Sequence, residues 1–256
     1  MRVLFVVHGY PPRETAGTER HAAVLAHGLR ARGHDVHTFA ATRAPGRPQY
    51  SVMSEPGITR IVNNVTARPL GQAERDPSVD AAFRRVQAQF QPDLVHVHHL
   101  QFLSSGLPVE APLIVTLHDQ WTWCAAGGTG ITAEGTRCSG PSPDRCAPCA
   151  AHWAPVLGRT GRTMSAAAGV LAPVVAPERL HRLYQRLPAR LRARVHRGRT
   201  PSDGPSAAAR RNAAMVGFVA GADARISPSR HLADLATAQG VGPVVHVPHG
   251  IEADWH

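Results

Sequence analysis

Short apolar runs alternate along the chain with segments in which apolar residues recur at helical spacing. The first run, Val3–Val7, is continuously apolar, as expected of a strand buried on both faces of a parallel sheet. Beyond the glycine- and proline-containing residues 8–17, apolar side chains recur at i, i+3, i+4 and i+7, which predicts a helix. These side chains are Ala22, Leu25, Ala26 and Leu29. Gly33 is expected to end that helix and Val36–Ala40 to form a second strand, which completes a βαβ unit.

The same alternation continues towards residue 250. Further strands are predicted at Ile58–Val65, Leu94–Val97, Leu113–Leu117, Ala224–Ile226 and Val244–Val247. Helices are predicted at 79–90, at 207–221 and after Ser229, a residue type that caps helix N-termini. Another helical face runs over 180–187 and is broken by Pro188. Strands that alternate with helices predict an α/β fold with a Rossmann-like, doubly wound parallel sheet.

Residues 118–150 depart from this alternation because they show little periodicity and are rich in glycine, proline and threonine. A loop this long inside a compact domain is usually functional or held in place by something. All four cysteines lie here, at Cys124, Cys138, Cys146 and Cys149. Four thiols in such a loop are typical of a closed structural zinc site, which would hold a segment without a core of its own. Two alternatives stay open: reduced thiols without a metal, and a redox-active or disulfide-bonded Cys-x-x-Cys pair.

Composition narrows the classes of partner. Hydrophobic residues make up 43% of the chain, which is enough for a substantial core. The formal net charge is +10, but all 28 basic residues are arginine, which fits a bias in coding. Aromatic residues are only 5% and no basic stripe is interleaved with them. We therefore expect no nucleic acid partner.

The arginines are densest in the segment 178–199, where eight fall between positions 179 and 199. We expect this helical segment to lie on the surface and to give at most a weak contact with anionic membranes. No apolar stretch reaches the ~18 residues that a membrane span needs, and no signal peptide precedes the first strand. The sequence therefore predicts a cytoplasmic protein, with any membrane association peripheral and at the inner face of the membrane.

The candidate chemistry lies in the loops after the strands, because ligands of such sheets bind outside the carboxyl ends of the strands. The first of these loops lacks both a dinucleotide-binding Gly-x-Gly-x-x-Gly and a phosphate-binding Gly-Lys-Ser/Thr motif. It nevertheless places Gly17 at a helix N-terminus, where free N–H groups and the helix dipole favour an anionic group such as a phosphate. An ordinary turn glycine is the equally weighted alternative.

Two further loops carry histidine. His96 and His98 share one strand face because side chains repeat every two residues, and we expect one to pack and the other to line the crevice. A metal pair is the alternative, although no carboxylate lies at suitable spacing. His118 and Asp119 follow the next strand, where such a pair can do acid–base work or hydrogen-bond a hydroxyl-rich ligand. Trp121 can stack on a sugar face, but a His–Asp pair taken alone is more often structural.

Taken together, these segments resemble family-4 glycosyltransferases over nearly the whole chain. Ala16-Gly-Thr-Glu-Arg20 resembles the family's Gly-Gly-x-Glu motif, and residues 29–36 resemble its Arg-Gly-His-x-Val segment. Pro92–His99 looks like its Pro-Asp strand ending in His-x-His-His. The His118-Asp-x-Trp121 motif followed by the four cysteines is similar to a cysteine-containing subgroup. Residues 226–230 and 247–251 resemble the segments that close the N-terminal domain of the family.

The resemblance implies one half of a GT-B fold, in which two Rossmann-like domains face each other across a cleft. It implies transfer of a sugar from a nucleotide-sugar donor with retention of configuration and without a catalytic metal. By motif match, His118 and Asp119 would be catalytic, with His118 hydrogen-bonding the donor sugar near the reaction centre. Substrate-binding residues would be Gly17, Thr18, His98, His99, Trp121, Ser229 and Arg230.

Residues 1–256 would correspond to the N-terminal, acceptor-binding domain of such an enzyme. We expect the C-terminal donor-binding domain to be missing or separate, since no two glutamates have the eight-residue spacing typical of that half. The acceptor would be a glycan, a lipid-linked molecule or a small molecule, and the chain alone is expected to be inactive. Ala16, His249 and Glu252 replace the usual glycine, asparagine and aspartate. A non-catalytic carbohydrate-binding or zinc-stabilised interaction module is the alternative.

Overall fold

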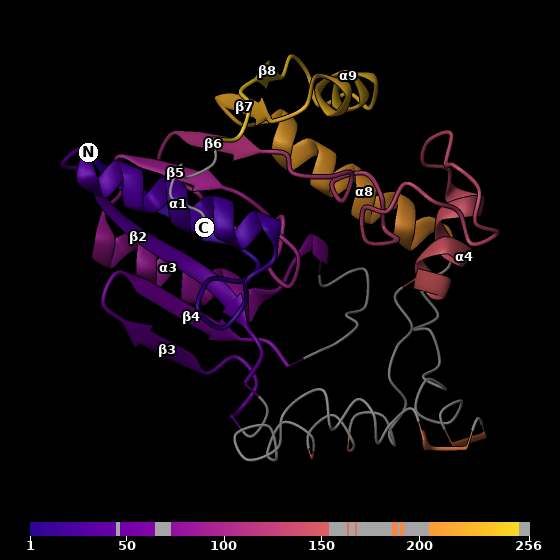
Figure 1. The fold of residues 1–256 in the computed structure, drawn as a ribbon, viewed down its shortest axis with the longest axis horizontal. Coiled ribbons are helices and arrows are strands. Elements are labelled where there is room, and N and C mark those ends of the chain that lie inside the picture. The colour runs from indigo at the N-terminus through magenta and orange to yellow at the C-terminus, as the bar shows by residue number, and fades with distance from the viewer. Residues whose placement is uncertain are drawn as a thin grey trace.

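The computed structural model describes residues 1–44, 47–64, 73–153 and 205–250, together with a few isolated positions between 163 and 191. The strands are β1 (Arg2–Val7), β2 (Asp35–Thr42), β3 (Val52–Glu55), β4 (Ile58–Val62), β5 (Leu94–Val97), β6 (Leu113–Thr116), β7 (Ala224–Ser227) and β8 (Val245–His246). They form one sheet in the order β3-β4-β2-β1-β5-β6-β7-β8. The helices are α1 (Gly17–Ala31), α3 (Pro77–Phe90), α4 (Pro143–Trp153), α8 (Pro205–Ala220) and α9 (Arg230–Ala238). The predicted α/β class with a Rossmann-like sheet is confirmed (Figure 1).

Neighbouring strands of the sheet are parallel except at one edge, where β3 pairs antiparallel with β4. The sequence did not predict β3, because its four residues are mostly exposed and show no continuous apolar run. Gly57, with φ at +73°, forms the tight turn between the two strands. The strand predicted at Ile58–Val65 ends at Val62, and residue 65 lies outside the described residues.

Helices cover both faces of the sheet, and the alternation of side chains along β1 shows why (Figure 1). Val3, Phe5 and Val7 point to the face that packs against α1. Leu4 and Val6 point to the opposite core, which α3, α8 and α9 cover. All five side chains are buried, as predicted for a continuous apolar run with no solvent-facing side.

Local signals in the sequence set several helix ends. Asp76 caps α3 by accepting from the Val79 backbone N–H at 3.4 Å, and Pro77 occupies the first turn. The predicted cap of α9 is confirmed, since the Ser229 hydroxyl accepts from Leu232 N–H at 3.3 Å. Gly33, with φ at +81°, follows the end of α1 as predicted. These ends fix the lengths of the loops on either side of each helix.

The prediction of a loop without regular structure over 118–150 is wrong at its C-terminal end, where α4 begins. The Ser142 hydroxyl accepts from the Arg145 backbone N–H at 3.3 Å, Pro143 is the first helical residue, and Asp144 follows in the first turn. Serine, proline and an acidic residue in this order are a helix-start signal that favoured α4 despite Pro148 within it.

The structure describes the predicted arginine-rich segment only in part. The arginine-rich segment 178–199 lies outside the described residues apart from 186–188, 190 and 191, of which Arg186 and Arg190 are exposed. The helix predicted at 207–221 begins earlier, at Pro205. Within the described part of the chain, no helix is both long and apolar enough to cross a membrane.

Candidate functional site

The loops after β1, β5 and β6 lie together at the carboxyl edge of the sheet, because these three strands are parallel neighbours. The ring centroids of His8, from the first loop, and His99, from the second, are 4.4 Å apart. His21 on α1 lies 5.3 Å from His118, which belongs to the third loop. The expectation that loops 8–18, 98–106 and 118–125 group at one edge is therefore confirmed.

Histidines dominate this edge. We call the following seven residues the histidine cluster: His8, His21, His96, His98, His99, His118 and His249. His21 and His249 stack with ring centroids 3.6 Å apart, and His118 lies 5.0 Å from His249. The Nδ1 atom of His98 lies 3.4 Å from Nε2 of His118, so one of these two nitrogens can donate to the other.

The structure buries both His96 and His98, so the expected division into one packing residue and one that lines the crevice stays a prediction. His96 packs beside Phe5, and its Nε2 lies 2.7 Å from the Thr116 hydroxyl. His98 is 1% exposed and stacks on His96 at 4.2 Å, and its Nε2 has no hydrogen-bond partner among the described residues. His96 is thus a satisfied core residue, whereas His98 keeps one buried polar atom available.

A second pair joins His99 to Asp119, two predicted site residues that lie on adjacent loops. His99 Nε2 lies 3.4 Å from Asp119 Oδ2, and the other carboxylate oxygen accepts from Trp121 N–H at 2.7 Å. Burial would raise the pKa of Asp119, but the hydrogen bond and charge of His99 outweigh it and lower that pKa. Asp119 is therefore an ionised carboxylate. The Trp121 ring lies 4.9 Å from His99 and under the guanidinium of Arg211 at 4.1 Å.

Burial favours the uncharged form of four imidazoles in the cluster, those of His21, His96, His98 and His118. Burial, together with the charge of a neighbouring histidine, lowers the pKa of His21 and of His96 to about 4. Burial and the charges of His21 and His249 lower the pKa of His118 to about 2. The pKa of His98 is likewise far below its usual value. At neutral pH these rings can exchange hydrogen bonds with a ligand but do not act as cationic acids.

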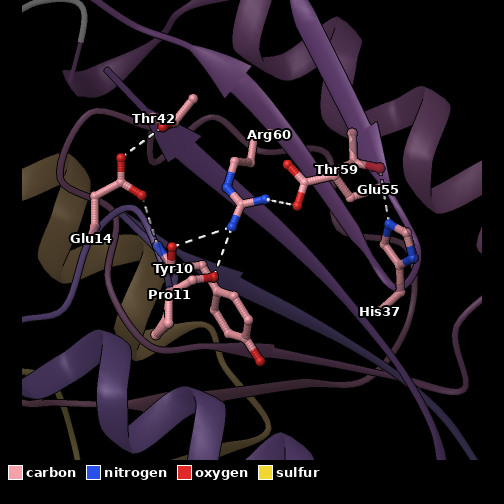
Figure 2. Close-up of polar contacts among 8 residues, drawn as sticks. All are labelled: Tyr10, Pro11, Glu14, His37, Thr42, Glu55, Thr59 and Arg60. Carbon is pink, nitrogen blue, oxygen red and sulfur yellow. Dashed lines mark hydrogen bonds and ion pairs between the residues drawn. The ribbon is translucent and has the colours of Figure 1, made fainter. Parts of the chain in front are cut away.

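A buried arginine fixes the loop after β1 (Figure 2). Arg60 of β4 is fully buried and donates to the carbonyl oxygens of Pro11 at 2.9 Å and Tyr10 at 3.3 Å. Its other terminal nitrogen pairs with Glu55 at 2.9 Å. Glu14 of the same loop accepts from the Thr42 hydroxyl at 2.6 Å and from Tyr10 N–H at 3.3 Å. These bonds join the first loop to β2 and β4.

Beside this loop is a polar pocket of about 280 Å³, which we call the loop pocket. Its polar lining includes His8, Glu14, Glu19, Thr42, Asn63 and Gln101. Glu19 is 4% exposed, and its Oε1 pairs with His8 Nε2 at 3.1 Å. Within the part of the chain that the structure describes, its Oε2 has no hydrogen-bond partner. Burial would raise the pKa of Glu19, but the hydrogen bond and charge of His8 outweigh it and lower that pKa. The loop pocket thus contains an ionised carboxylate with a free acceptor atom.

Gly17 and Thr18 begin α1 at this same edge. Ala16, at the N-cap position, makes no side-chain hydrogen bond to the first turn. Gly17 is exposed, and a Cβ atom placed on it would meet nothing within 4 Å. The approach to the first N–H groups of α1 is therefore open, and an anion-binding role for Gly17 and Thr18 stays a prediction.

Ser229 and Arg230 were also predicted to bind substrate. The Ser229 hydroxyl is used as the cap of α9, and Arg230 is exposed. Among the described residues, no hydrogen bond joins either of them to the histidine cluster. Substrate binding by these two residues stays a prediction, while the capping role of Ser229 has a direct structural cause.

The four cysteines line one pocket of about 370 Å³, separate from the loop pocket. None of them forms a disulfide. Cys146 and Cys149 lie on α4 rather than in an irregular loop. With the side chains as they stand, no three His, Cys, Asp or Glu residues of the described ranges are placed to hold a metal ion.

Sequence reasoning missed four residues of the edge as site residues: His8, Glu19, His21 and His249. A histidine follows β1, β5 and β6 directly or within two residues, and this recurrence was the available signal for His8. Glu19 and His21 lie in the first two turns of α1, on the side that faces the sheet edge. His249 follows β8, where it was noted only as a departure from a motif.

Comparisons with known proteins place the sequence in context. The family described as Glycosyltransferase Family 4 matches residues 15–143, just over half of the chain. Among solved structures, the chain is similar to sucrose-phosphate synthase from Thermosynechococcus elongatus, with 13% sequence identity and a TM-score of 0.47. That match covers 98% of this chain and 49% of the other, so the chain spans about half the length of that protein. A search of curated proteins finds no match.

The lowered histidine pKa values predict a pH-dependent stability. Unfolded His96 takes up a proton below its ordinary pKa of 6.5, whereas folded His96 stays neutral down to about pH 4. Between these limits acid should therefore lower the free energy of unfolding, by up to ~1.4 kcal/mol per pH unit for a single histidine. His96→Gln should reduce this slope in urea unfolding at several pH values. His27→Gln, at an exposed position, should not, and equal slopes for both variants would contradict the assignment.

The contacts of Arg60 predict that it stabilises the first loop. Arg60→Met leaves the carbonyls of Tyr10 and Pro11 without their donor, so unfolding in urea should become easier by roughly 1–3 kcal/mol. Arg85→Met changes the same residue type at an exposed position of α3 and serves as the control. Equal midpoints for the two variants would show that Arg60 does not hold the loop.

Proposed function

Since the chain belongs to glycosyltransferase family 4, we propose that it acts in glycosyl transfer as the acceptor-binding half of a retaining enzyme. A nucleotide sugar, held by a donor-binding domain, would supply the sugar. The acceptor would be a glycan, a lipid-linked molecule or a small molecule bearing a hydroxyl group. No catalytic metal is part of this proposal.

The observation that carries the proposal is the convergence of two histidine pairs beside the loop pocket. His118 with His98, and His99 with Asp119, come from the ends of β5 and β6. His8 links the two regions, because its ring packs on His99 and its Nε2 pairs with Glu19 of the loop pocket. Polar groups at the carboxyl edge of a parallel sheet are where a ligand of such a fold is expected.

The chemistry of these groups suits hydroxyl recognition. A neutral imidazole can donate from one nitrogen and accept at the other, which matches a sugar hydroxyl in either direction. His118, whose pKa is lowered to about 2, stays in that form at any physiological pH. In the proposed role it orients a hydroxyl of the donor sugar, and Asp119 orients His99 beside it. His118 would therefore contribute by hydrogen bonding in the transition state and not by giving up a proton.

The loop pocket is the proposed place of the acceptor. Glu19 offers an unpartnered, ionised oxygen there, and the Thr42 hydroxyl holds Glu14 next to it. Carboxylate oxygens accept hydrogen bonds from hydroxyl or amine groups, and such charge-assisted bonds are the stronger kind. The pocket volume of about 280 Å³ is on the scale of a single sugar ring with room for water.

The first test measures acceptor binding by the purified chain. A panel of monosaccharides, disaccharides and cyclitols is screened by saturation-transfer NMR, and the affinity of binders is measured by calorimetry. Glu19→Gln should weaken binding about tenfold, the loss expected for one charge-assisted hydrogen bond. Glu110→Gln, an exposed carboxylate elsewhere, should leave the affinity unchanged. The acceptor role would be excluded if no member of the panel binds or if Glu19→Gln binds as well as the unmodified chain.

The second test measures turnover with a radiolabelled sugar-nucleotide panel, first for the chain alone and then with a donor-binding partner. We expect no multiple turnover by the chain alone. In the complete system, His118→Ala should lower kcat about 10²-fold and leave KM for the acceptor within a few-fold, because its contact is made at the reaction centre. His27→Ala is the exposed control. Repeated turnover without a partner would overturn the half-enzyme proposal, and an effect on KM alone would move His118 away from the reaction centre.

A further inference from the structure

The four thiols come from three segments of the chain and meet at one pocket, which we call the thiol pocket. Cys124 follows the Trp121–Trp123 turn, and its backbone N–H donates to the Gln120 carbonyl at 2.9 Å. Cys138 follows the short Ile131–Arg137 bridge and donates its N–H to the Gly130 carbonyl at 2.8 Å. The thiol pocket, of about 370 Å³, is lined by all four cysteines. Their meeting is therefore a product of the fold and not of adjacency in sequence.

Helix α4 contributes the second pair. Cys146 and Cys149 are three residues apart, so their side chains lie on the same face of the helix. Helix α4 packs against α8 (Figure 1). The amide nitrogen of Asn212 on α8 lies 3.9 Å from the Cys146 sulfur. All four cysteines line the thiol pocket, so this pair on α4 lies at the same cavity as Cys124 and Cys138.

A buried arginine beside the thiol pocket provides an independent observation. Arg211 is 1% exposed, donates to the Thr122 carbonyl at 3.1 Å and lies over the Trp121 ring at 4.1 Å. Its Nη2 is buried. Among the described residues, this nitrogen has no hydrogen-bond partner, and no carboxylate lies within ion-pair distance of the guanidinium. Arg211 Nη1 also donates to the Asn212 side-chain oxygen at 2.9 Å, and the amide nitrogen of Asn212 lies 3.9 Å from the Cys146 sulfur. A buried cation with an unpaired donor is stabilised by negative charge nearby, and thiolates in the thiol pocket would supply that charge.

Residues 120–141, which surround the thiol pocket, have little apolar packing to hold them in one conformation. They have few buried apolar side chains, and five of their glycines adopt positive φ angles: Gly127, Gly128, Gly130, Gly135 and Gly140. Glycines in such conformations lose much backbone freedom when the segment is ordered. A metal bound by four side chains from three segments offsets this loss directly.

We propose that Cys124, Cys138, Cys146 and Cys149 bind one structural zinc ion as thiolates. Because the four sulfurs do not meet at a metal position as they stand, the side chains turn toward the centre of the thiol pocket on binding. Four S–H protons leave, four Zn–S bonds of about 2.3 Å form, and the site gains a net charge of −2. Arg211 then neutralises part of that charge. With four protein ligands the ion has no open position and takes no part in catalysis.

Arg211 connects the proposed zinc site to the histidine cluster through a chain of contacts. This residue joins the thiol pocket to Thr122 and Trp121, and Trp121 in turn packs on His99 and donates its N–H to Asp119. The zinc ion therefore acts as a positioning element for the His118-Asp119 loop. The proposal stands independently of glycosyl transfer, because metal content can be measured without a substrate.

The test is elemental analysis of the chain purified under reducing conditions without chelator. About one zinc per chain is expected, and Cys149→Ser should lower zinc content at least tenfold and lower the melting temperature. Ile131→Val, which changes the lining of the same pocket without removing a sulfur, should keep the metal. Since Cys149→Ser can fail to fold, the unmodified chain is also loaded with cobalt, whose thiolate charge-transfer absorption reports coordination by sulfur.

Three results would overturn the proposal. One is less than a tenth of a zinc per chain, together with four rapidly titrating thiols. Another is cobalt loading without charge-transfer bands, which would place the metal on other ligands. The third is an intact mass lacking two hydrogen atoms per cysteine pair, which would make the site a disulfide.

Discussion

Two buried guanidinium groups hold the loops on which the candidate site is built. Arg60 on β4 donates to the carbonyls of Tyr10 and Pro11, and Arg211 on α8 donates to the carbonyl of Thr122. A buried carbonyl left without a donor costs roughly 1–3 kcal/mol, so each arginine selects one loop conformation instead of simply adding contact area. The loop after β1 and the loop after β6 are thus held from two different elements, and the histidines meet where these loops meet.

Burial then decides what the site can do chemically. Burial lowers the pKa of His21 and of His249, and neutral rings can stack as closely as these two do. Glu19 and Asp119 stay ionised, because each is paired with a histidine. The edge of the sheet therefore offers many hydrogen-bonding atoms and few mobile protons, which favours recognition of hydroxyl groups over acid catalysis.

Much of this arrangement could be predicted from the sequence, because it depends on local patterns. The apolar runs predicted the central strands, and Ser229 predicted the start of α9. The ends of the predicted strands indicated where His98, His118 and Asp119 lie. What could not be predicted depends on contacts between distant segments. β3 forms by antiparallel pairing with β4, and this pairing leaves no pattern in the residues of β3 themselves. Arg60 is buried with its guanidinium donating to a carbonyl of the first loop, about 50 residues away in sequence. α4 differs, since its Ser142-Pro143-Asp144 signal was present in the sequence and was outweighed by the glycine-rich composition around it.

The short strands at the two sides of the sheet have a consequence for the behaviour of the chain in a crowded solution. Among the described residues, the outermost strands are β3, with four residues, and β8, with two. Another chain can pair with an unpaired strand edge by backbone hydrogen bonding, and the tendency to aggregate in this way increases with the length of the edge strand. The long apolar strands β1 and β2 are enclosed between neighbours instead. The order of strands therefore keeps the most aggregation-prone backbone away from intermolecular pairing.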